Sequence, residues 1–263
     1  MNKRGQSTIF IIIGIVIVLI IALGIVFSSE IADTVGLGER ISYPIEIEEV
    51  REVIQECVDV SAEEAVIMFG ITGGYYHLPD NVYETDVTLP YYYFDGNDLM
   101  PSLSNIEEEL GEYVMFLVGS CVYLDDVTDF DLDLKEMDAE VSIEEGLVEF
   151  SVEYPFDASV EEMLYNVYEP YEYEVNVDLN NVYGVASLIV QHDIENPDEI
   201  DLDYLLSLGL DVSYVSYDDG NFVYILEDNT AFNGESTYVF MFASYFPLPE
   251  EYEDMTLEEY LSV

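Results

Sequence analysis

Cys57 and Cys121 are the residues whose chemistry the sequence predicts most directly. Two cysteines in an oxidising compartment favour a disulfide, and closing a loop of about 65 residues would stabilise the fold by roughly 4 kcal/mol because the unfolded chain loses entropy. Two buried thiols packed as small core residues are the alternative. His77 and His192 have no metal-ligand spacing to either cysteine, so no metal site is expected there.

A second candidate is an acidic run that imitates part of a calcium-binding loop. Asp129, Asp131 and Asp133 alternate along the chain, and Glu140 stands at the twelfth position of the run. The sixth position is Leu134, where the tight turn of such a loop needs glycine. The alternating apolar residues fit a strand with its aspartates facing solvent, and this is the favoured interpretation.

Carboxylate pairs could also act as the acid and base of a hydrolase. With 57 Asp and Glu residues, such pairs arise everywhere and their spacing carries no information. The chain lacks a phosphate-binding glycine loop, a zinc-protease HExxH motif and a GxSxG nucleophile elbow. No cofactor is therefore expected, and a non-enzymatic protein is favoured over a membrane-tethered hydrolase.

Two groups of tyrosines could form a contact patch for a protein partner. They are Tyr75 and Tyr76, and the run Tyr91, Tyr92 and Tyr93. Tyrosine offers a large contact area with a polar tip, which suits interfaces. Ordinary packing in strands and core is the alternative, and it is favoured for these residues.

The net charge of −52 belongs to one part of the chain. The first 40 residues are neutral, and beyond them Arg51 and Lys135 are the only bases. Such a surface excludes binding to nucleic-acid phosphates, whereas 50% hydrophobic residues indicate a folded protein. Acids spread throughout predict adaptation to molar salt, which screens their repulsion. A calcium-loaded surface or capture of a basic partner are the alternatives.

Residues 9–27 form an uncharged apolar run long enough to cross a bilayer as a helix. Lys3 and Arg4 on the short flank predict a cytoplasmic N-terminus and an extracellular acidic domain. The predicted organisation is a cytoplasmic segment 1–8, a transmembrane helix 9–27, a linker 28–43, an acidic extracellular domain 44–246 and an acidic tail 247–263. The anchor makes the lipid bilayer an expected partner.

The N-terminal sequence KRGQSTIF and the apolar helix after it resemble single-pass surface proteins of small symbiotic archaea, DPANN organisms of the nanohaloarchaeon type. They are also similar to archaeal class III prepilin signals, which implies processing between Gly5 and Gln6. Prepilins of this kind carry glutamate where this chain has Phe10, and that glutamate is linked to filament assembly. The resemblance extends loosely through residues 73–76, 90–97, 105–121 and 238–246, and it implies no activity.

The apolar pattern predicts an α+β domain with a mostly antiparallel sheet. Helices are expected from Ile47 to Phe69, from a Ser104–Glu107 capping box to Cys121, from Leu179 to His192, and from Asp201 to Leu208. Strands are expected at 82–89, 91–94, 130–134, 141–143, 147–154, 171–177, 212–217, 222–226 and 238–246.

Three functional hypotheses follow from these patterns. The leading one is a non-enzymatic, membrane-anchored cell-surface protein of a halophilic archaeon, with an envelope-structural or cell-contact role. The second is a pilin-like filament subunit processed at Gly5–Gln6, and the third is the membrane-tethered hydrolase. The sequence leaves the oligomeric state open.

Overall fold

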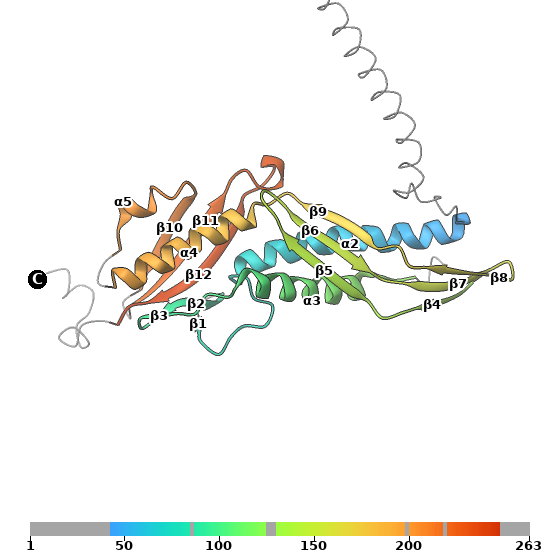
Figure 1. Cartoon of the computed structure of the whole chain (residues 1–263), viewed down its shortest axis with the longest axis horizontal. Helices are drawn as coiled ribbons and strands as arrows, with labels where there is room; N and C mark the ends of the chain where they lie inside the picture. The colour runs from blue at the N-terminus through green and yellow to red at the C-terminus, as the bar shows by residue number, and fades with distance from the viewer. Residues whose placement is uncertain (1–42, 85–86, 125–129, 198–199, 218–219, 248–263) are drawn as a thin grey trace, which may run out of the picture. The chain divides into compact units, whose positions relative to one another are not determined.

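The computed structural model describes residues 43–84, 87–124, 130–197, 200–217 and 220–247 (Figure 1). The chain divides after Ile45 into two compact units, and apart from the first residue of α2 all described elements lie in the second. The helices are α2 (Ile45–Ile71), α3 (Leu103–Cys121), α4 (Leu179–Glu195) and the short α5 (Leu202–Leu205). The predicted α+β class is confirmed.

The strands form three sheets in which antiparallel pairing dominates. The largest has the order β1-β2-β12-β11-β10, with β3 paired to β2. Its strands are β1 (Val82–Glu84), β2 (Thr88–Phe94), β12 (Tyr238–Tyr245), β11 (Asn221–Asp228), β10 (Asp211–Ser216) and β3 (Asn97–Asp98). β12 pairs with β2 in parallel, whereas the other described pairs are antiparallel. A strand from the end of the domain therefore lies beside one from its beginning.

The other two sheets have three strands each. One has the order β5-β6-β9, with bounds Asp138–Ile143, Val148–Glu153 and Tyr171–Val175. The second has the order β4-β7-β8, with bounds Asp131–Leu134, Phe156–Val160 and Met163–Val167. The sequence pattern did not predict β7 and β8. Their turn consists of Glu161 and Glu162, both with positive φ (51° and 67°), where the pattern would require glycine or asparagine.

The predicted first helix is confirmed as α2, whose buried face follows the apolar spacing from Ile47 to Phe69. The helix includes Gly70 and ends at Ile71, and Gly73 and Gly74 adopt positive φ after it. Gly70 has a packing role, because a Cβ there would overlap the carbonyl oxygen of Val239 on β12. The end of α2 is thus pressed directly against the largest sheet.

The start of α3 differs from the predicted capping box. Ser102 is the N-cap, and its side chain accepts a hydrogen bond from the backbone N–H of Asn105. Glu107 instead accepts a hydrogen bond from the backbone N–H of Ile143 at 3.0 Å. The sequence motif was misread because this glutamate serves the neighbouring strand β5 and not its own helix.

α4 packs on the largest sheet (Figure 1). The core of this sheet is rich in aromatic rings. Asp178 caps α4 by accepting from the backbone N–H of Asn181. In the core, Tyr92 stacks on Phe242 with ring centroids 4.6 Å apart, and Tyr224 lies 5.2 Å from the same ring. These ring contacts join β2, β12 and β11 within the sheet.

Within the described residues, no helix combines the length and apolar character needed to span a bilayer. The predicted transmembrane helix 9–27 and the processing site at Gly5 and Gln6 lie outside the described residues, as does almost all of the predicted tail 247–263.

Candidate functional site

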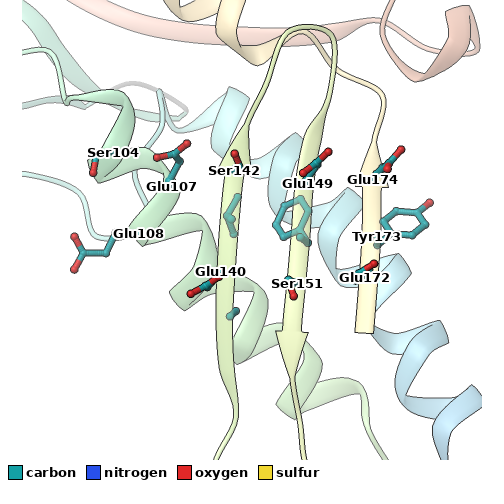
Figure 2. Close-up of a pocket in the computed structure, with 13 residues that line it drawn as sticks. Ser104, Glu107, Glu108, Glu140, Ser142, Glu149, Ser151, Glu172, Tyr173 and Glu174 are labelled. Atoms are coloured by element: carbon teal, nitrogen blue, oxygen red, sulfur yellow. The ribbon is translucent and has the colours of Figure 1, made fainter. Parts of the chain in front are cut away.

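A broad groove lined by carboxylates lies over the sheet β5-β6-β9 and the start of α3, with a volume of about 610 Å³. Figure 2 shows its acidic side chains rising from three neighbouring strands, with two more on α3. The acidic lining residues are Glu107, Glu108, Glu140, Glu149, Glu172 and Glu174. The groove therefore brings six acidic side chains onto one face of the described fold.

Strand alternation explains why these acids share a face. Phe150 points into the core, while its neighbours Glu149 and Ser151 point into the groove. The register places Glu149 directly opposite Glu174, and Ser151 between Glu140 and Glu172. Like charges directly opposite each other on a sheet destabilise it, and dissolved salt would screen the repulsion of this pair.

The acids on the strands of the groove lie in the open. Glu140, Glu149, Glu172 and Glu174 are exposed to solvent. Among the residues that the structure describes, no group of three or more histidine, cysteine or acidic side chains is placed to hold a metal ion. An open carboxylate face of this kind attracts hydrated cations or a basic surface.

The favoured strand interpretation of the acidic run holds for its described part, because Asp131 and Asp133 lie on strand β4. Asp129 lies outside the described residues. Asp133 stands opposite Asp157 of β7, and Lys135 pairs with both, at 2.5 Å and 2.8 Å. The lysine lowers the pKa of Asp157 through a hydrogen bond, so a side-chain cation already lies between these two carboxylates.

The tyrosine patch is wrong for Tyr91, Tyr92 and Tyr93, which are only 8%, 0% and 1% exposed. They lie on β2, between β1 and β12, where both faces of the strand are covered. Tyr92 donates a hydrogen bond to the carbonyl oxygen of Gly73. The packing alternative therefore holds for these three residues, while Tyr75 and Tyr76 are half-buried.

Tyr76 belongs to an aromatic cluster that the tyrosine runs did not reveal. Its ring lies 4.8 Å from Tyr113 and 6.3 Å from Phe116, both on α3. Glu109 holds the segment in place by accepting hydrogen bonds from the backbone N–H groups of Tyr76 and His77, at 2.6 Å and 2.8 Å. Phe116 is 57% exposed, so the cluster reaches the surface.

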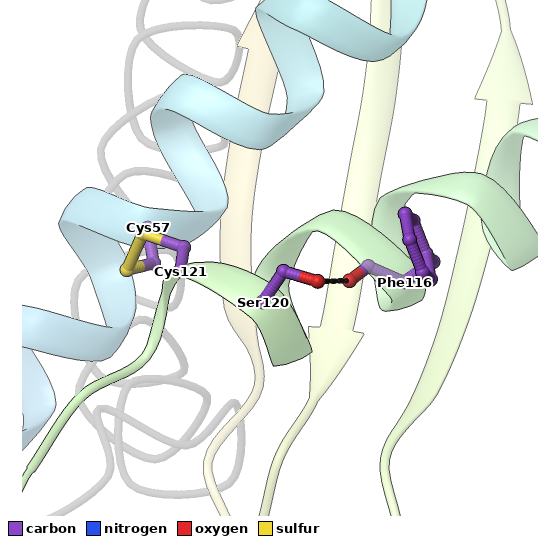
Figure 3. The surroundings of a disulfide bond; sticks show 4 residues. All are labelled: Cys57, Phe116, Ser120 and Cys121. Carbon is purple, nitrogen blue, oxygen red and sulfur yellow. Dashed lines mark hydrogen bonds between the residues drawn. A yellow bond between two sulfur atoms is a disulfide. The ribbon is translucent and has the colours of Figure 1, made fainter.

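The predicted disulfide is present and joins α2 to the end of α3 (Figure 3). The Cα atoms of Cys57 and Cys121 lie 5.7 Å apart, and 64 positions separate the two residues. Cys57 is buried in the middle of α2, whereas Cys121 is the last residue of α3 and is exposed. The bond therefore clamps the two helices at one end of their shared interface.

A buried carboxyl group lies apart from the groove, at Asp193 on α4. It is 2% exposed and accepts hydrogen bonds from the hydroxyls of Tyr224 and Ser244, both at 3.0 Å. Burial raises the pKa of Asp193 to about 7. No pattern in the sequence marks this group, because a single acid in a helix cannot be told from a solvent-facing residue until its partners are known.

Comparison with known proteins found no matching family model, no matching curated protein and no matching solved structure.

Proposed function

We propose that this chain is a non-enzymatic, membrane-anchored cell-surface protein of a halophilic archaeon, with an envelope-structural or cell-contact role. The apolar segment 9–27 holds it in the bilayer, with residues 1–8 in the cytoplasm and the acidic domain outside. The observation that carries the proposal is a disulfide-clamped domain that displays an open carboxylate face.

The disulfide supports the extracellular placement. Structural disulfides persist in oxidising compartments and are rare in a reducing cytosol. Cys121 is exposed, so a reducing compartment would have access to the bond. The crosslink between α2 and α3 therefore agrees with the extracellular placement that Lys3 and Arg4 predict.

The carboxylate face supports the halophilic setting. Glu149 and Glu174 face each other across β6 and β9, and the arginine and lysine of the domain, Arg51 and Lys135, pair with other acids. At about 1 M salt the screening length falls to roughly 3 Å, so the repulsion between these side chains becomes small. The aromatic cluster at Tyr76 and Phe116 offers a surface for the contact role.

Membrane topology provides the test. In intact cells, added protease should digest the domain, and the remaining fragment should stay with membranes after alkaline extraction. Recovery of the full chain in the soluble fraction, or its protection until the cells are lysed, would contradict the proposal. A cytoplasmic protein of the same cells is the control for lysis.

The mass of the mature N-terminus separates this proposal from the pilin-like alternative. A surface protein retains residues 1–5, whereas a processed pilin begins at Gln6. Phe10 stands where the filament-forming family carries the glutamate linked to assembly, which favours the surface protein and its intact N-terminus over the filament subunit. A mature chain beginning at Gln6 would support the filament subunit instead.

A further inference from the structure

The strand β8 is an open edge of the sheet β4-β7-β8. Within the described residues it pairs with β7 alone. Its side chains face solvent at most positions, with Met163 55% exposed and Leu164 67% exposed. An edge of this kind presents unpaired backbone N–H and C=O groups to any strand that can approach it.

β8 differs from the other described edge strands in its charge. Its five residues, Met163–Val167, include no acid. The other edges each carry at least one: Glu84 on β1, Asp98 on β3, Asp131 and Asp133 on β4, Asp138 and Glu140 on β5, Glu172 and Glu174 on β9, and Asp211 on β10. Charged residues on an edge prevent pairing between copies, and β8 lacks that protection.

We propose that β8 pairs with β8 of a second copy of this chain, antiparallel, to form a continuous six-stranded sheet β4-β7-β8-β8-β7-β4. A basic partner would be attracted to the acidic edges and not to this one. An uncharged, apolar strand instead complements a strand like itself, and antiparallel self-pairing closes a two-fold dimer. Leu164 is the exposed apolar residue nearest the middle of the proposed seam.

The rest of the small sheet holds β8 ready for pairing. Val167 is buried opposite Phe156 of β7, and Asn166 hydrogen-bonds Asp157. β8 is therefore fixed in an extended conformation before a partner arrives, which lowers the ordering cost of association. Glu161, Glu162 and Glu169 flank the strand, so we expect pairing to strengthen in molar salt.

Cysteine crosslinking of the full-length protein tests the pairing. Both native cysteines are bonded to each other, so a cysteine introduced by Met163→Cys, Leu164→Cys or Tyr165→Cys is the single free thiol. Residues facing each other at an antiparallel two-fold seam have Cα atoms about 4.5–5.5 Å apart, within disulfide range. Val215→Cys, on the acidic edge strand β10 and 44% exposed, is the matched control.

In mild oxidant and molar KCl, at least one β8 variant should give a crosslinked dimer of twice the chain mass. Its yield of dimer should be about ten times the yield from Val215→Cys. The proposal would be overturned if no β8 variant gave more dimer than the control, or if the crosslinked products had only masses other than twice the chain mass. The control also accounts for copies brought together by their N-terminal segments in detergent micelles.

Sedimentation of the uncrosslinked, full-length protein provides an independent measurement. Leu164→Asp would place two carboxylates in the seam and should weaken dimerisation about tenfold or more, whereas Leu164→Val should leave it unchanged. Equal dimerisation by both variants would contradict pairing through β8. Leu164 is exposed, so neither change disturbs the core.

Discussion

Asp193 is a carboxyl group buried between α4 and the largest sheet. The folded state binds the proton of Asp193 more tightly than the unfolded chain, because burial raises the pKa from 3.8 to about 7. The associated stability is fully present below about pH 4 and is lost as the pH rises to about 7. The upper part of this window lies above the ordinary carboxyl pKa values of about 4, so we expect Asp193 to set the slope there.

We therefore expect the free energy of unfolding to fall between pH 5.5 and 8 in the unmodified protein, and Asp193→Asn to flatten this dependence. The full shift corresponds to an effect on the order of 4 kcal/mol. Asparagine can still accept a hydrogen bond from Tyr224 or Ser244. Denaturant titrations at constant salt provide the measurement. Asp203→Asn, which removes an exposed acid on α5, should keep the original slope.

Gly70 allows the end of α2 to approach β12 closely. A side chain at Gly70 would collide with backbone and with the ring of Tyr238, so Gly70→Ala should destabilise the fold by about 1–3 kcal/mol. Gly184, on the exposed side of α4, has open space around it. Gly184→Ala should therefore stabilise by about 0.5–1 kcal/mol through helix propensity alone. Thermal unfolding of both variants would show opposite signs, and equal signs would contradict the packing argument.

The disulfide is the other link between elements. Replacing Cys57 and Cys121 with alanine should lower the free energy of unfolding by about 4 kcal/mol on the chain-entropy model. Reduction of the unmodified protein should give the same loss, and the reductant should have no effect on the double variant. A double variant as stable as the original would show that α2 and α3 stay together by packing alone.

Periodicity predicted the elements better than it predicted their partners. α2, α4 and the hairpin β10-β11 follow from local spacing, whereas the parallel pairing of β2 with β12 joins segments that share no local signal. β7 and β8 were missed because Glu161 and Glu162 adopt left-handed conformations that acids rarely occupy. The acids of the groove were visible in the sequence, but only the register places Glu149 opposite Glu174.

For the molecule as a whole, repulsion among carboxylates opposes folding. The net charge is −52, and beyond residue 40 it is opposed only by Arg51 and Lys135. Raising KCl from about 0.15 M to 2 M shortens the screening length several-fold. We expect the midpoint of thermal unfolding of the full-length protein to rise steeply over this range. Sucrose at matched osmolality does not screen charge and should give a much smaller rise, and equal midpoints at low and high KCl would falsify the halophilic interpretation.

The crosslink between Cys57 and Cys121 also affects how the molecule would respond to damage. A protease cut anywhere in residues 58–120 would leave both fragments joined covalently, because the bond spans the cut. The strand β2 lies within that span and is held between β1 and β12. A nicked molecule would therefore migrate as one species without reductant and as two species with it. A single backbone break in residues 58–120 would not release the domain from its N-terminal segment.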